Sequence, residues 1–158
     1  MPGGAPVAAR PRLPQLPLVG LGLLLVPAQQ AHACTCPRRP SPRHAVKKAV
    51  AVFVGKVVDI RIPKADPDTD VLVKFQVHRS WKGVASGTAL VTTPPRLHSC
   101  SYSFQAGKEY LVYAYAKKSV GFRTNICTRT TTIDRAQADL AVLGPAAFTG
   151  RSAGQERK

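Results

Sequence analysis

Four cysteines constrain this chain of 158 residues more than any other feature, because two of them are separated by a single residue. These two are Cys34 and Cys36 in the sequence Cys34-Thr35-Cys36, and the others are Cys100 and Cys127. Four cysteines allow three pairings. A bond between Cys34 and Cys36 would close a strained ring of very few atoms, which disulfide geometry disfavours. Both cysteines of the tripeptide are therefore expected to bond to distant cysteines, and two long-range pairings remain open.

The first 33 residues have the pattern of a secretory signal peptide. Arg10 and Arg12 form a basic start, an apolar run extends from Leu16 to Val26, and Ala31-His32-Ala33 is a small-x-small cleavage site. The apolar run is short for a membrane span. Ala31 stands where a lipidation signal usually carries Leu, three residues before the cysteine, and this favours ordinary cleavage over lipoprotein anchoring. We expect a secreted or extracytoplasmic protein, with signal peptide 1–33 and a mature N-terminus at Cys34.

Export to an oxidising compartment favours two disulfides as the state of the four cysteines. Cleavage after residue 33 of 158 would leave 125 residues, which is enough for one core and small enough to benefit from crosslinks. A zinc site is the competing interpretation, but the chain has no Cys-x-x-Cys motif. The histidines after the cleavage site, which are His44, His78 and His98, show no metal-pair spacing and are predicted to lie on the surface.

Five segments rich in β-branched and aromatic residues predict strands. They are Ala49–Ile62, with a bulge expected at Gly55, and Val71–Trp81, Thr88–Thr93, Glu109–Ala116 and Phe122–Thr130. Ser41-Pro42 predicts a short helix over Pro42–Lys48, and Thr132 and Gly144 are expected to begin and end a helix over Ile133–Leu143. The prediction is an all-β protein with minor helix, a five-stranded barrel of the OB type, and the alternative is a β-sandwich. Residues 145–158 are expected to be a flexible tail.

The chain after the signal peptide is strongly basic. Two of the 23 lysines and arginines fall in the signal peptide, which leaves 21 against 8 acidic residues, a net charge of +13. Six of the eleven residues from Arg38 to Lys48 are Arg, Lys or His. An exported basic protein of this kind suits anionic polysaccharide, lipid headgroups at a membrane surface, or acidic proteins. No nucleic-acid-binding signature is present, so nucleic acid is not an expected partner.

No motif of a catalytic nucleophile or of a zinc protease is present, so we expect neither enzymatic activity nor a cofactor. Asp66, Asp68 and Asp70 have the alternate spacing of a calcium loop. The glycine and the closing glutamate that such loops need are missing. We therefore interpret these carboxylates as a solvated tip between two strands.

The tripeptide and the segments after it occur in an order that resembles one family. Cys34-Thr35-Cys36 directly after a signal peptide is similar to the mature start of the tissue inhibitors of metalloproteinases. Ala49 to Val57 is similar to the first strand of that family, and Trp81-Lys82-Gly83 to the turn that ends its second strand. The segment from Thr93-Pro94 to Cys100-Ser101-Tyr102, and Cys127 followed by a helix, extend the resemblance over residues 34–144.

This resemblance implies a netrin-like OB barrel over residues 34–144, in which Cys34 pairs with Cys100 and Cys36 with Cys127. The basic, proline-rich signal and the lack of a counterpart to the family's second domain suggest a microbial single-domain relative. The resemblance thus resolves the pairing that the spacing of the cysteines left open.

The resemblance also implies a function, inhibition of a zinc metalloendopeptidase whose identity is not specified. The amine and carbonyl oxygen of Cys34 would chelate the zinc of the target protease, and Thr35 would enter its specificity pocket. Leu97, His98 and Ser99 would flank the cleft. The alternative is an extracellular netrin-like binding module without inhibitory activity, with anionic polysaccharide, lipid or protein as the partner.

Overall fold

The computed structural model describes residues 33–64, 66, 68–85, 87–117 and 121–150. Residues 1–32 of the predicted signal peptide and residues 151–158 of the expected tail lie outside this part of the chain. Among the described residues, no helix is both long and apolar enough to cross a membrane.

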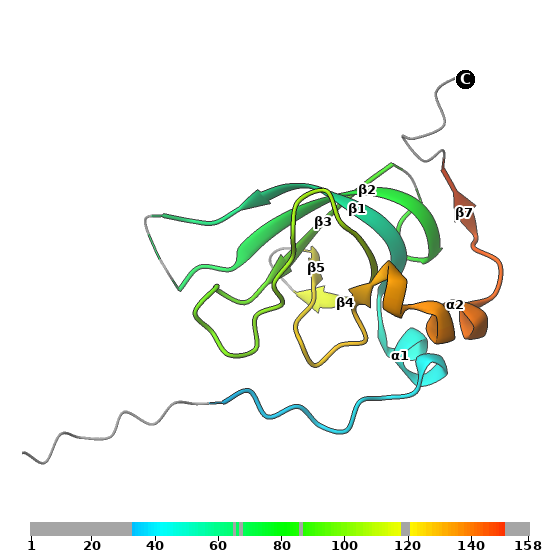
Figure 1. The fold of residues 1–158 in the computed structure, drawn as a ribbon, viewed down its shortest axis with the longest axis horizontal. Coiled ribbons are helices and arrows are strands. Elements are labelled where there is room, and N and C mark those ends of the chain that lie inside the picture. Colours follow the sequence, from blue (N-terminus) through cyan, green and yellow to red (C-terminus); the bar gives the residue numbers. More distant parts are fainter. Residues whose placement is uncertain (1–32, 65, 67, 86, 118–120, 151–158) are drawn as a thin grey trace, which may run out of the picture. The chain divides into compact units, whose positions relative to one another are not determined.

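Five strands close into a barrel (Figure 1). They are β1 (Ala51–Arg61), β2 (Val71–Lys82), β3 (Thr88–Thr93), β4 (Glu109–Lys117) and β5 (Gly121–Arg123). The order around the barrel is β1-β2-β3-β5-β4, and β4 pairs with β1 to close it. Neighbours are antiparallel except β3 and β5, which are parallel. The predicted five-stranded barrel of the OB type is confirmed, and the β-sandwich is excluded.

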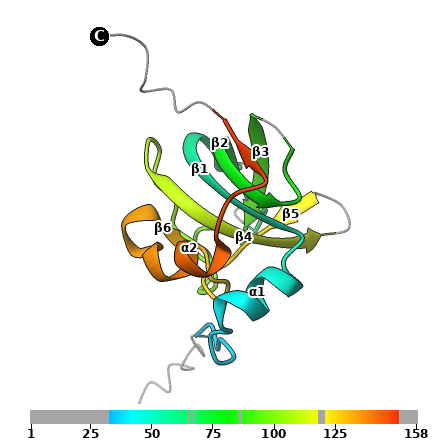
Figure 2. The same cartoon turned by 90° about the vertical axis from the view of Figure 1, so that its right-hand side faces the viewer.

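Residues 51–55 of β1 and residues 110–114 of β4 are buried on both faces, which explains their continuous apolar sequences. Inside the barrel, the rings of Phe53 and Phe75 meet edge to face with 5.5 Å between their centroids. On the outer face, Val54, Leu111 and Tyr113 pack beneath two short helices, α1 (Pro42–Lys48) and α2 (Gln137–Leu143). Figures 1 and 2 show the two helices side by side against this face.

The Trp81-Lys82-Gly83 turn fastens both helices to the barrel. The indole Nε1 of Trp81 donates a hydrogen bond to the carbonyl of Gly144 at the end of α2, at 2.9 Å. The ammonium of Lys82 donates to two carbonyls in the last turn of α1, at 3.2 and 3.4 Å, where a cation is favoured. Gly83 has a φ of +75°, and a Cβ there would lie 2.1 Å from the carbonyl oxygen of Val50, so the turn requires glycine.

The first helix has the predicted bounds, and Ser41 accepts a hydrogen bond from the N–H of His44 as the predicted N-cap. The second helix begins later than predicted. Thr131–Thr132 (β6) pair with β4, residues 133–135 form a 3-10 turn, and Thr132 makes no capping hydrogen bond. Its hydroxyl bonds to the carboxylate of Asp134, which lowers the pKa of that carboxyl. Gly144, with a φ of +67°, ends α2 as predicted.

The fifth strand is shorter than predicted, because only Gly121–Arg123 pair and residues 124–130 form turns. The hydroxyl of Thr124 lies 2.8 Å from those of both Thr128 and Thr130, and all three side chains are buried. β-branched residues are typical of strands, but here their hydroxyls provide hydrogen bonds that the turns need. Cys127 therefore lies in a turn and not in a strand.

The prediction that His78 lies on the surface is wrong. The register of β1 against β2 skips His78, which makes it the extra residue of a β-bulge opposite the Val54/Gly55 step. The residue is buried, and its Nδ1 lies 2.6 Å from the carboxylate of Glu109. The register shift expected at Gly55 is present, but the additional residue belongs to the neighbouring strand.

The predicted tail also needs correction, because Phe148–Thr149 form a short strand, β7, that pairs with β2. The ring of Phe148 packs against the core inside the barrel. The N–H of Gly150 donates to the carbonyl of His78 at 2.7 Å, next to the paired residues of β7 and β2. An apolar ring and the bulged edge of β2 together order these residues.

Candidate functional site

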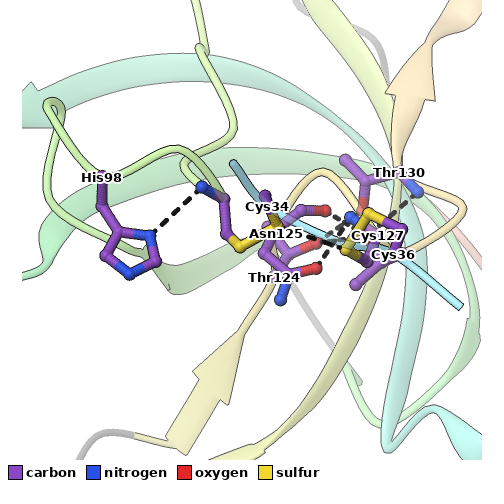
Figure 3. The surroundings of a disulfide bond; sticks show 9 residues. Cys34, Cys36, His98, Thr124, Asn125, Cys127 and Thr130 are labelled. Atoms are coloured by element: carbon purple, nitrogen blue, oxygen red, sulfur yellow. Dashed lines mark hydrogen bonds between the residues drawn. A yellow bond between two sulfur atoms is a disulfide. The ribbon is translucent and has the colours of Figure 1, made fainter. Parts of the chain in front are cut away.

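Two disulfides hold the tripeptide Cys34-Thr35-Cys36 against the barrel. They join Cys34 to Cys100 and Cys36 to Cys127, with Cα atoms 5.0 and 5.2 Å apart, and they confirm the pairing that the resemblance implied. Figure 3 shows the two bonds next to each other, and the sulfurs of Cys34 and Cys127 lie 3.6 Å apart. The side chain of Thr35 between them is exposed. We call residues 34–36 together with residues 97–100 the disulfide ridge.

The sulfurs of the disulfide ridge are not available as metal ligands. Those of Cys34, Cys36 and Cys127 lie within 4.8 Å of one another. All four cysteines of the chain are bonded as disulfides, whereas a metal site would need thiolates. Within the described part of the chain, no other group of three or more His, Cys, Asp or Glu side chains is close enough to hold an ion.

The loop after β3 positions Cys100 through its own polar groups. The N–H of Cys100 donates to Nδ1 of His98 at 3.1 Å (Figure 3). The hydroxyl of Ser101 donates to the carbonyl of Pro94 at 2.8 Å. These bonds fix the backbone on both sides of Cys100 and leave the His98 ring exposed.

The predicted cleft-flanking residues form part of the disulfide ridge. Leu97, His98 and Ser99 directly precede Cys100, and all three are exposed. Leu97 is 92% exposed, which is unusual for a large apolar side chain. The bond between Cys34 and Cys100, which are 66 residues apart in the sequence, brings this segment beside the tripeptide.

Sequence reasoning missed Asn125, which positions the other disulfide. Its Oδ1 accepts a hydrogen bond from the N–H of Cys127 at 2.9 Å (Figure 3). The N–H of Ile126 donates to the carbonyl of Cys100 at 3.2 Å and joins the two cysteine-bearing loops. The signal that could have identified this turn is the spacing Asn-x-Cys, because an Asn side chain commonly bonds to the backbone two residues later.

A buried ion pair that sequence reasoning also missed holds the chain just after the tripeptide. Arg129 donates two hydrogen bonds to Asp139 of α2, both at 2.6 Å, and a third to the carbonyl of Pro40 at 2.7 Å. The side chains are only 15% and 5% exposed. Tyr113 of β4 donates to the same carboxylate at 2.9 Å. The pair thus connects the N-terminal segment, α2 and the barrel.

The pKa values of this network follow from its contacts. Burial alone raises the pKa of Asp139, but the hydrogen bonds from Arg129 and Tyr113 outweigh it and lower the pKa below 3.8. The hydrogen bond to Asp139 raises the pKa of Arg129. Burial, then the neighbouring carboxylate, raises the pKa of Tyr113. At neutral pH the network is therefore an ion pair with a neutral phenol.

The disulfide ridge is a rigid, exposed edge that a binding partner can approach. Its backbone is fixed by two covalent bonds on either side of one side chain, so little conformational entropy remains to be lost on docking.

No protein-family model matches the sequence, and no curated protein is significantly similar to it.

Proposed function

We propose that this protein is a secreted inhibitor of zinc metalloendopeptidases, which binds the catalytic zinc of its target through the α-amine and carbonyl oxygen of Cys34. The observation that carries the proposal is the exposed Thr35 between two disulfide-bonded cysteines, directly after a predicted cleavage site. Cleavage after Ala33 would give Cys34 a free amine at the edge of the barrel. A disulfide framework alone does not require two cysteines on either side of one residue.

The chemistry suits a catalytic zinc ion. The amine nitrogen and carbonyl oxygen of one residue close a five-membered ring on a metal. A catalytic zinc keeps a position open for water, and it accepts a fifth ligand. An α-amine has a pKa of about 8 in peptides, so it can lose its proton to the solvent when it binds a metal near neutral pH. The zinc-bound water that the protease would activate is displaced.

The rigidity of the disulfide ridge supports inhibition over cleavage. An extended substrate is pulled into register across the zinc, whereas the tripeptide is bonded to Cys100 and Cys127 on its two sides. The backbone N–H groups of those two cysteines are held in turn by hydrogen bonds to His98 and Asn125. The tripeptide can enter a cleft as a substrate does, but it cannot move further along it.

The test is inhibition of a panel of zinc metalloendopeptidases in competition with a small hydroxamate. We expect the protein and the hydroxamate to exclude each other, because both ligate the same zinc ion. Because the hydroxamate itself blocks the enzyme, exclusion is read from the kinetics of double inhibition. Simultaneous binding of the protein and the hydroxamate to one protease would contradict zinc ligation and would point to a different contact.

Thr35 is expected to set the strength of inhibition. Replacing Thr35→Gly removes the side chain that would enter the pocket and should weaken inhibition by about tenfold to a hundredfold, the usual worth of one small group in such a pocket. Because Thr35 is exposed, thermal stability should stay unchanged. The matched control is Ser103→Gly, which removes another exposed hydroxyl-bearing side chain outside the disulfide ridge and should leave inhibition unchanged. Equal inhibition constants for Thr35→Gly and wild type would exclude the pocket role.

A second candidate function is binding of anionic polysaccharide through the segment around α1. Arg38, Arg43, Lys47 and Lys48 are exposed, and α1 has no acidic residue in its first turn. This concentration of positive charge on one short segment is what favours a polyanion. Such binding needs no free amine at Cys34.

We expect retention on an immobilised sulfated polysaccharide that decreases steeply with salt. The double change Lys47→Glu and Lys48→Glu should lower the eluting salt concentration. The control is the single change Lys74→Glu, which also replaces an exposed lysine but lies on β2. It distinguishes binding by the segment around α1 from retention by the overall positive charge of the protein. A lower eluting salt for Lys74→Glu than for the double variant would argue against this segment.

A further inference from the structure

Next to the disulfide ridge, and sharing Leu97 with it, lies a surface that combines exposed apolar side chains with a cation that has no partner among the described residues. Two adjoining cavities of about 180 and 460 Å³ share the lining residues Ile62, Val71 and Arg96. Leu97 borders the larger cavity and is 92% exposed, and Ile62 is 44% exposed. We call this surface, between the end of β1, the start of β2 and the loop after β3, the Arg96 trough.

The guanidinium of Arg96 makes no hydrogen bond or ion pair with any residue that the structure describes. Carboxylates of β1 and of the turn before β2 already have partners. Asp59 pairs with Arg61 at 3.0 Å, and Asp70 pairs with Arg123 at 3.0 Å. Asp66 accepts hydrogen bonds from a backbone N–H and from a threonine hydroxyl of its own turn, at 2.9 and 2.7 Å. A partner that brings a carboxylate would therefore meet a free guanidinium.

The size of the cavities decides what they can hold. Small-molecule sites measure about 300–1,000 Å³. The smaller cavity is below this range and is lined by the buried Val73 and the partly buried Phe104, so it suits a single apolar side chain. The larger cavity is lined by Pro63 and Leu97 and is open to solvent. Arg96 lines both cavities and so lies where they meet.

We propose that the Arg96 trough binds an extended peptide segment in which one acidic side chain lies between two bulky apolar ones. The apolar side chains occupy the two cavities, and the carboxylate pairs with Arg96. Charge complementarity favours this occupant, because the net charge of the chain is strongly positive and the local cation is unpaired. The site does not involve the Cys34 amine, so it is independent of the proposed zinc ligation.

The test uses two capped pentapeptides as probes, Gly-Phe-Glu-Phe-Gly and Gly-Phe-Lys-Phe-Gly, titrated into the disulfide-bonded, ¹⁵N-labelled protein. With the glutamate peptide we expect amide shifts that saturate and that are confined to residues 60–62, 69–73 and 93–104. Replacing Arg96→Glu should lower the affinity for the glutamate peptide by about tenfold, because an attraction becomes a repulsion. The same change should raise the affinity for the lysine peptide, because a repulsion becomes an attraction.

The matched control is Arg43→Glu, which reverses another exposed arginine on α1 and should leave both affinities unchanged. The proposal is overturned if millimolar peptide causes no shifts, if the shifts lie elsewhere, or if Arg96→Glu and Arg43→Glu weaken binding equally. None of these results bears on inhibition through Cys34. Loss of inhibition in the N-terminal variants would likewise leave the peptide titration unaffected.

Discussion

One additional alanine before Cys34 should reduce inhibition of a sensitive metalloendopeptidase by about a thousandfold, which corresponds to roughly 4 kcal/mol of binding free energy. The extension converts the α-amine of Cys34 into an amide, which does not ligate zinc, and places an extra residue in the cleft. Both contacts that the proposal assigns to Cys34 are lost together. The measurement is the inhibition constant of the variant against that of the wild type.

The extended variant must be compared at equal folding. Its disulfide map and melting temperature should match those of the wild type, because the barrel core does not include the tripeptide. N-terminal sequencing of the variant confirms that the alanine is retained. An extended protein that inhibits as strongly as the wild type would show that the α-amine takes no part.

The second large effect concerns stability. Replacing Asp139→Asn should lower the free energy of unfolding by about 3 kcal/mol, because it leaves the buried guanidinium of Arg129 without its counter-charge. The exposed Asp134→Asn is the matched control and should leave stability nearly unchanged. Denaturant unfolding of both variants and of the wild type at neutral pH gives the comparison.

The cost of Asp139→Asn should also depend on pH. The pKa of Asp139 is lowered in the fold, since the hydrogen bonds from Arg129 and Tyr113 outweigh the effect of burial. Its carboxylate therefore stabilises the fold at every pH above its unfolded value of 3.8, and this contribution is lost as the pH falls through the folded pKa. We expect a constant difference between wild type and variant from neutral pH to about pH 5, and a smaller one below about pH 4. A difference that grows on acidification would contradict this assignment.

Most of the barrel could be predicted because its strands carry local signals. Thr88–Thr93 and the first helix have the predicted bounds, since proline, glycine and serine mark their ends. The predicted fifth strand is too long because the branched shape of threonine favours strands. The hydrogen bonds between the buried threonine hydroxyls, which hold residues 124–130 in turns, depend on the tertiary fold. His78 was misplaced for a related reason. Its bulge is fixed by pairing with β1 and β7, which are distant in sequence.

The candidate site shows the same division. The tripeptide could be recognised because a predicted cleavage site directly precedes it, but the pairing of its cysteines came from a family resemblance and not from their spacing. The ion pair of Arg129 with Asp139 could not be predicted, because its members lie on an irregular turn and on a helix whose contact is part of the tertiary fold. The exposed tripeptide could thus be predicted from the sequence, whereas the buried ion pair that holds the chain beside it could not.

The central claim is tested most directly by N-terminal sequencing of the exported protein, followed by titration of the same sample against a panel of zinc metalloendopeptidases. The account predicts an unblocked Cys34 as the first residue and stoichiometric inhibition of at least one protease in the panel. A blocked or lipidated Cys34, or a verified free Cys34 amine that leaves every protease in the panel fully active, would contradict it.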